Sequence, residues 1–219
     1  MADCCEDKAC EIVALRESHG RVLWIVLALN AAMFFVEGYA GLVAHSTSLL
    51  ADALDMLGDA LVYGFSLFVL NRPAQWQARA ALAKGAFMLI FGLAVLAEAA
   101  SKTLVATMPA AHTMGIIGAL ALAVNLACFF MLYRHRADNL NMSSTWLCSR
   151  NDLIANAGVL VAAGATYLLA SRWPDILVGV AIAALFLKSA VSVLRDSLAA
   201  LRKPSVPVSM RSPIQIRRS

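Results

Sequence analysis

Six long apolar runs, separated by short polar connections, dominate the pattern of hydrophobic and polar positions along the chain. A helix needs about 20 mostly apolar residues to cross a bilayer. Six segments reach that length: 22–44, 47–70, 80–101, 113–133, 143–170 and 174–194. Gly, Pro, Asn and charged residues collect between them. The pattern predicts an all-α membrane protein, a six-transmembrane-helix bundle that occupies residues 21–201 and lies in the lipid bilayer.

The two ends of the chain are more polar than the segments between them. Residues 1–20 lack the short apolar core of a secretory signal, so we expect a cytoplasmic, cysteine-containing tail ahead of a first helix that is retained. Residues 202–219 are rich in Pro, Ser and Arg and poor in aromatic side chains. This composition is typical of a disordered basic tail.

The placement of Lys and Arg predicts the orientation of the bundle. They gather in the N-terminal tail, in the second-to-third and fourth-to-fifth connections, and in the C-terminal tail, whereas the alternate connections hold only Lys102 and Arg172. Because positive residues stay on the cytoplasmic side, we expect both termini in the cytoplasm. The short connections and the absence of a targeting segment favour a bacterial inner membrane. The net charge of +4 is therefore explained by the orientation of the helices in the membrane. The sequence has no basic face interleaved with aromatic residues, so we expect no nucleic-acid partner.

Composition agrees with membrane insertion, since 61% of residues are hydrophobic and only 15% are charged, against about a quarter charged in soluble domains. Among the five cysteines, those in the cytoplasmic tail stay reduced, which argues against a disulfide scaffold. Cys128 lies among Leu, Ala and Phe and is interpreted as a small buried side chain.

Two polar stripes interrupt the apolar segments. Asp52, Asp55 and Asp59 are spaced by three and four residues, so they share one face of the second helix. Cys148, Asp152 and Asn156 follow one another at intervals of four in the fifth helix. Ionisable residues inside a membrane usually face the bundle interior and mark a functional site. Burying carboxylates is costly unless they are paired, and a cation between the two helices would offset that cost.

Antiparallel packing of the two helices would bring two ligands from each together: Asp55 and Asp59 from the second, Cys148 and Asp152 from the fifth. Four mixed oxygen and sulfur ligands suit tetrahedral Zn²⁺, and a thiolate makes Cd²⁺ an alternative. Asp52 and Asn156, one turn away, are secondary candidates. Cys4, Cys5 and Cys10, among acidic residues, are candidates for capturing a soft ion, with a flexible solvated tail as the alternative.

At these residues the sequence resembles the cation diffusion facilitator family of metal/proton antiporters. The resemblance rests on "HSTSLLADALDMLGD", "CSRNDLIANAGVLVAA" and "WPDILVGVAIAALFLKSAVSVLRDSLAAL". It implies metal ligands at Asp55, Asp59 and Asp152, with Cys148 at a position where the family usually has His or Asp. Family members commonly continue into a cytoplasmic domain that helps them dimerise. This sequence ends about where that domain would begin, so we expect a form without it, and a homodimer stays an open alternative.

The function predicted from these features is efflux of a divalent metal cation, Zn²⁺ or Cd²⁺, in exchange for protons. The metal is the transported ligand and no cofactor is expected. A non-transporting membrane metal sensor or accessory subunit is the alternative. The apolar segments contain no nucleophile with a well-placed His, so we do not expect an enzyme.

Other charged residues have simpler explanations. Glu98 and Lys102 lie one turn apart and are expected to form an ion pair. Glu37 is expected to pair within the bundle or to line the exit path. Asp175 begins the sixth helix, where its charge suits the helix dipole, and His45 is expected at the surface.

Overall fold

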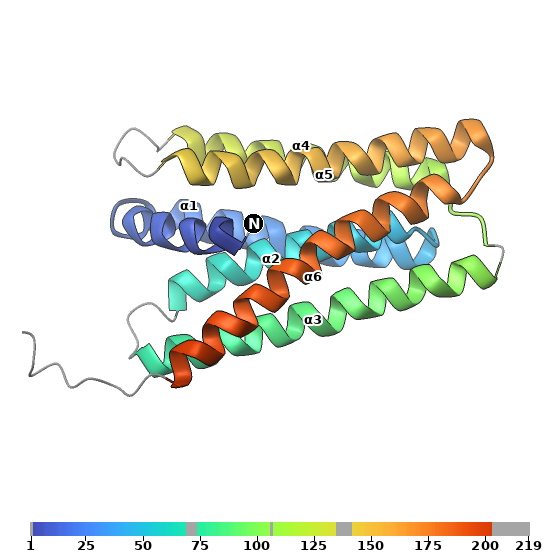
Figure 1. Ribbon diagram of the computed structural model, residues 1–219. Coiled ribbons are helices and arrows are strands. Elements are labelled where there is room, and N and C mark those ends of the chain that lie inside the picture. Colours follow the sequence, from blue (N-terminus) through green and yellow to red (C-terminus); the bar gives the residue numbers. More distant parts are fainter. Residues whose placement is uncertain (1, 69–73, 106, 135–141, 203–219) are drawn as a thin grey trace, which may run out of the picture.

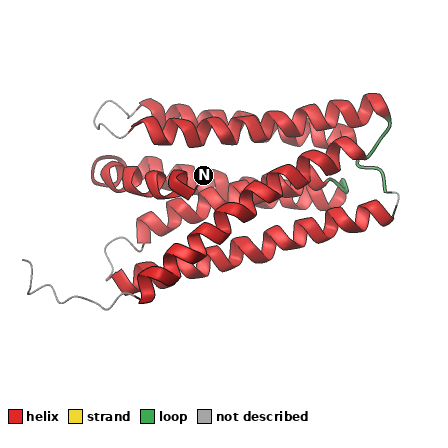
Figure 2. Cartoon of the chain, in the orientation of Figure 1, coloured by secondary structure: helices red, strands yellow, loops and turns green. Residues whose placement is uncertain are grey.

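The computed structural model describes residues 2–68, 74–105, 107–134 and 142–202 (Figure 1). The side chains of residues 2–20, 66, 68, 74, 133–134 and 142–151 are outside that description. Every regular element within these ranges is an α-helix (Figure 2). The helices are α1 (Ala2–Val43), α2 (Thr47–Phe68), α3 (Ala74–Leu104), α4 (Ala111–Arg134), α5 (Met142–Leu169) and α6 (Trp173–Arg202).

Each of the six apolar segments corresponds to one helix, which confirms the predicted all-α fold. The difference lies at the two ends. Helix α1 begins at Ala2 instead of near residue 22, because the polar run before the first span contains three Ala and three Glu, which favour a helix, and no Pro. Helix α6 continues past residue 194 to Arg202. The basic segment 203–219 lies outside the described residues.

Within the described residues, five helices contain a stretch long and apolar enough to cross a membrane: Arg21–Val43, Gln75–Leu104, Ala111–Leu132, Asp152–Leu169 and Trp173–Arg202. Helix α2 carries three aspartates over 22 residues. It packs against α1, α3, α5 and α6, and none of its described side chains is exposed, so it is enclosed by the other helices. Large apolar side chains on the surrounding helices point outward; Phe35, Tyr39 and Tyr167 are 70%, 72% and 76% exposed. An apolar exterior around a polar central helix is the arrangement expected of a membrane bundle.

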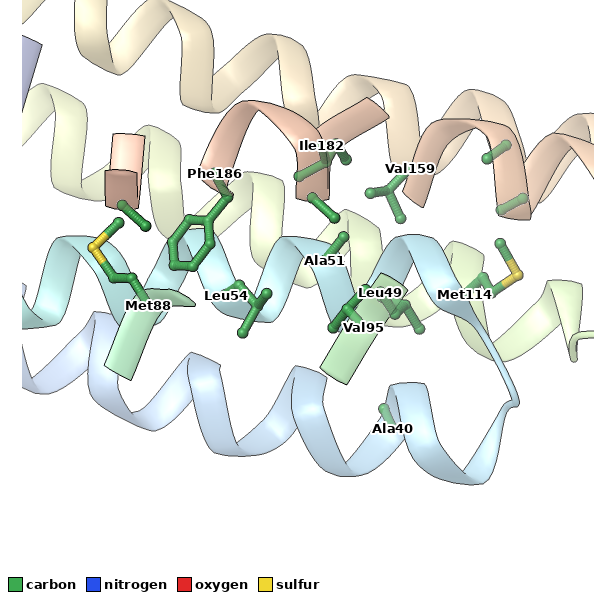
Figure 3. Close-up of a cluster of buried hydrophobic side chains, with 14 residues drawn as sticks. Ala40, Leu49, Ala51, Leu54, Met88, Val95, Met114, Val159, Ile182 and Phe186 are labelled. Atoms are coloured by element: carbon green, nitrogen blue, oxygen red, sulfur yellow. The ribbon is translucent and has the colours of Figure 1, made fainter. Parts of the chain in front are cut away.

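The main apolar cluster lies along one side of α2. Leu49, Ala51 and Leu54 of α2 belong to one buried cluster with Ile182 and Phe186 of α6 (Figure 3). Further members come from α1, α3, α4 and α5: Ala40, Met88, Val95, Met114 and Val159. The aspartates of α2 therefore occupy the helix face that this packing leaves over.

The connections α1–α2, α3–α4 and α5–α6 lie at the same end of the bundle, on the right in Figure 1. The backbone N–H of Ala110 donates to the carbonyl of Ala44 at 2.9 Å, which ties the first two of these connections together. These are the connections poor in Lys and Arg, so we call this end the predicted external end.

The α1–α2 connection is a tight helix ending. The N–H of Ser46 donates to the carbonyl of Gly41 at 2.9 Å, and that of His45 donates to the carbonyl of Leu42 at 3.3 Å. This is the Schellman pattern, which requires a left-handed residue after the helix. His45 takes that position with φ 50° and is exposed, as predicted. Its role is to turn the chain directly into α2.

Candidate metal-binding site

The acidic stripe of α2 lies inside the bundle. Asp52 is fully buried, and Asp55 and Asp59 are partly buried. Gly58, on the side of α2 that faces α6, allows close packing, because a Cβ there would lie 3.1 Å from the ring of Phe186. Tight packing on α6 thus holds the acidic face of α2 toward the other helices.

Helix α5 meets this stripe through Asn156. The Asn156 side-chain amide donates to Asp52 Oδ1 at 3.2 Å and to the backbone carbonyl of Asp152 at 3.0 Å. Asn156 is fully buried, and Asp52 lies close enough to Asp152 for their charges to interact. A direct hydrogen bond therefore connects the polar stripes of α2 and α5.

This bond also fixes the register of the two antiparallel helices. At 1.5 Å per residue, Asp55 and Asp152 lie about 4.5 and 6 Å along their helices from the Asp52–Asn156 pair. Asp59 and the backbone of Cys148 lie about 10.5 and 12 Å from the same pair. The successive positions of the two stripes therefore fall at matching levels along the bundle, away from the predicted external end.

Four candidate ligands have side chains outside the described residues: Cys148, Cys4, Cys5 and Cys10. Among the side chains that the structure does describe, no three His, Cys, Asp or Glu groups lie close enough together to hold a metal ion. The described carboxylates alone thus do not form a finished coordination shell.

Sequence reasoning missed the part that α1 plays. Glu37 is fully buried and close enough to Asp52 and Asp55 for their charges to interact. Seven residues before it, Asn30 is also buried and donates to the carbonyl of Val26 at 2.9 Å and to Cys128 Sγ at 3.9 Å. The spacing of seven, two helical turns, was the available signal that both side chains share the inner face of α1.

At the predicted external end, Asp175 of α6 caps the beginning of α2. Its Oδ2 accepts from the N–H of Thr47 at 2.8 Å, and its Oδ1 accepts from the N–H and hydroxyl of Ser48 at 2.9 and 2.7 Å and from the hydroxyl of Ser46 at 2.7 Å. Ser46 Oγ accepts from the N–H of Leu49 at 3.1 Å. We call this group of Ser46, Thr47, Ser48 and Asp175 the α2 cap. The charge of Asp175 was expected to serve its own helix, but its bonds are to α2.

The predicted ion pair beside the α2 cap is confirmed. Lys102 Nζ lies 2.7 Å from Glu98 Oε1 and also donates to the hydroxyl of Thr47 at 3.1 Å. The Thr47 hydroxyl donates in turn to Glu98 Oε2 at 3.2 Å. Glu98, Lys102 and Thr47 are therefore paired with one another.

Cys128 of α4 is buried, as predicted, at 5% exposure.

Comparison with known proteins bears on the site. The family described as cation efflux transmembrane domain matches residues 23–202. The chain is 25% identical over 194 residues to the cadmium, cobalt and zinc/H(+)-K(+) antiporter of Bacillus subtilis, with 81% of this chain and 62% of the relative covered. It is 26% identical over 190 residues to the metal cation efflux system protein CzcD of Cupriavidus metallidurans, with coverage of 81% and 60%. It is 25% identical over 209 residues to the zinc transporter ZitB of Escherichia coli, with coverage of 89% and 66%. The chain thus spans between 60% and 66% of the length of these relatives.

Proposed function

Since the chain belongs to the cation efflux family, we propose that it exports a divalent metal cation, Zn²⁺ or Cd²⁺, in exchange for protons. Its relatives are named as transporters and antiporters of cadmium, cobalt and zinc rather than as enzymes. The apolar helices and the bacterial relatives support an integral protein of the plasma membrane.

The proposed ligands are Asp55 and Asp59 of α2 with Cys148 and Asp152 of α5. The supporting observation is the Asn156–Asp52 bond at 3.2 Å, because it makes the two stripes neighbours in an antiparallel register. Their levels match to within about 1.5 Å, less than half a helical turn. A divalent ion drawn in between them would offset the cost of burying carboxylates, which is several kcal/mol for each unpaired charge.

Exchange with protons follows from the chemistry of these ligands. Carboxylates and thiolates bind a metal only after losing their protons, so metal binding and proton release are linked. Metal enters when the site faces the cytoplasm, and protons from the other side reclaim the ligands and release it. Ion binding can drive the change between the cytoplasm-facing and outward-facing states only if the ion binds these two states with different affinity.

The test is metal uptake into sealed proteoliposomes with a simultaneous pH readout. We expect Asp59→Ala and Asp152→Ala each to abolish metal-driven proton movement, whereas Asp196→Ala, which removes an exposed carboxylate of α6, leaves it intact. Cys148→Ser should weaken Cd²⁺ more than Zn²⁺, because thiolates favour the softer ion. Undiminished transport in both aspartate variants would rule out the ligand assignment. Metal binding without movement of either ion would instead favour the sensor or accessory role.

A further inference from the structure

Glu37 is a buried carboxylate for which the described structure provides no counter-charge and no hydrogen bond. The residue is fully buried, and neither Oε1 nor Oε2 has a hydrogen-bond partner among the described residues. The expected pairing within the bundle is thus not observed. Buried carboxylates are almost always paired or coordinate a metal, so this group needs a positively charged or hydrogen-bonding partner from elsewhere.

Two neighbouring side chains have the same deficiency. Asp52 Oδ2 and Asn156 Oδ1 are buried and, within the described part of the chain, lack a hydrogen-bond partner. Asp52 and Asn156 use their other polar atoms to bond to each other at 3.2 Å, and Glu37 interacts electrostatically with Asp52. Helices α1, α2 and α5 therefore contribute four oxygens that can accept, and no donor among the described side chains is directed at them.

This surplus of acceptors differs from the α2 cap, where each carboxylate oxygen of Asp175 accepts from a donor. The cation closest to the cap, Lys102, is held by Glu98 at 2.7 Å. A polar group that serves only structure is expected to be satisfied internally. A set of buried oxygens without donors is complementary to a bound cation.

We propose that Glu37, Asp52 and Asn156 form a second divalent-cation site, built from oxygen ligands alone. Asp52 lies five residues into α2, about 8 Å from its beginning, so this second site lies between the proposed Asp55–Asp59–Cys148–Asp152 site and the predicted external end. Carboxylate and amide oxygens prefer harder ions such as Mn²⁺, while a site with a thiolate prefers softer ones. The two sites therefore differ in chemistry as well as in depth.

Mn²⁺ serves as the probe, because the electron paramagnetic resonance signal of the free ion loses intensity on binding, so the number of bound ions follows by difference from the total. The background is the full chain with Asp59→Asn and Cys148→Ser, which disables the first site at the two ligands furthest from Glu37. We expect this protein, purified in detergent, to retain one Mn²⁺ per chain. Adding Glu37→Gln, which keeps the size of the side chain, should weaken Mn²⁺ binding at least tenfold. Adding Asp196→Asn, which removes one charge from an exposed part of α6, should leave it unchanged.

Two results would overturn the second site: a background protein that binds no Mn²⁺, or binding that Glu37→Gln leaves unaltered. If Glu37→Gln does not yield monodisperse protein, Asp52→Asn gives the same reading from the neighbouring helix. The binding measurement is independent of the vesicle assay. Retained transport without this Mn²⁺ site removes only the further inference, and Mn²⁺ binding without transport removes only the proposed function.

Discussion

Replacing Asp175 with Ala tests how the helix that carries the acidic stripe is anchored. The change removes the acceptors of four hydrogen bonds between 2.7 and 2.9 Å, two from backbone N–H groups and two from serine hydroxyls. The hydroxyls can rotate toward other acceptors, but the N–H groups of Thr47 and Ser48 cannot. Both of these residues are fully buried, so water does not replace the carboxylate.

The expected cost follows from those two donors. Each buried donor left without a partner costs about 1–3 kcal/mol, and loss of a negative charge at a helix N-terminus adds about 0.3–1 kcal/mol. The sum is roughly 2–7 kcal/mol. Asp175→Asn should fall between the wild type and Asp175→Ala, because one side-chain oxygen still accepts while the new NH₂ group faces an N–H donor.

Thermal unfolding of the purified protein in detergent measures this difference. At about 2–4 °C per kcal/mol for a chain of this size, Asp175→Ala should lower the melting temperature by at least about 4 °C. The matched control is Asp196→Ala, which removes an exposed aspartate from the same helix and should change the melting temperature little. An Asp175→Ala shift no larger than that of the control would refute the assignment of Asp175 as the anchor of α2.

Substitutions at three further positions test the same end of the bundle. Gly179→Ala should destabilise the protein by about 1–3 kcal/mol and lower the melting temperature accordingly, because the new Cβ would lie 2.6 Å from the carbonyl carbon of Thr47 and 2.8 Å from the nitrogen of Ser48. Gly164→Ala is the control, because nothing lies within 4 Å of a Cβ at that position. It should instead stabilise α5 by up to about 1 kcal/mol. His45→Gly should raise the melting temperature slightly, by up to about 1 kcal/mol of stability, because glycine adopts the left-handed conformation at φ 50° without strain. Equal melting temperatures for His45→Gly and His45→Val would show that this backbone conformation carries no strain.

The helices could be predicted from the sequence because each depends on local information. A run of about 20 apolar residues is sufficient to indicate a span, and the intervals between Asp52, Asp55 and Asp59 are sufficient to place them on one face. The pairing of Glu98 with Lys102 was also predictable, since both lie on one helix four residues apart. These conclusions need no knowledge of which helices are neighbours.

The partners of Asp175 and the isolation of Glu37 could not be predicted, because both depend on tertiary packing. Asp175 is separated from Thr47 by 128 positions, and local reasoning assigned its charge to the nearer helix end, that of α6. Glu37 was expected to pair because buried charges usually do. Only the packing of α1 against α2 shows that the charged groups it interacts with, Asp52 and Asp55, are themselves acceptors.

The contrast between these two regions explains how the bundle can hold unpaired oxygens in its interior. At the predicted external end, the three N–H groups that open α2 all have side-chain acceptors, from Asp175 and Ser46. About five residues further along α2, Asp52 Oδ2 has no hydrogen-bond partner among the described residues, and neither has either carboxylate oxygen of Glu37 on α1. The free energy cost of burying these unpaired oxygens must be offset by favourable interactions elsewhere in the bundle. The α2 cap and the apolar cluster around Leu54 and Phe186 provide such interactions directly to α2. A helix fixed at its beginning and along its apolar face keeps its acidic face directed inward even before a cation arrives.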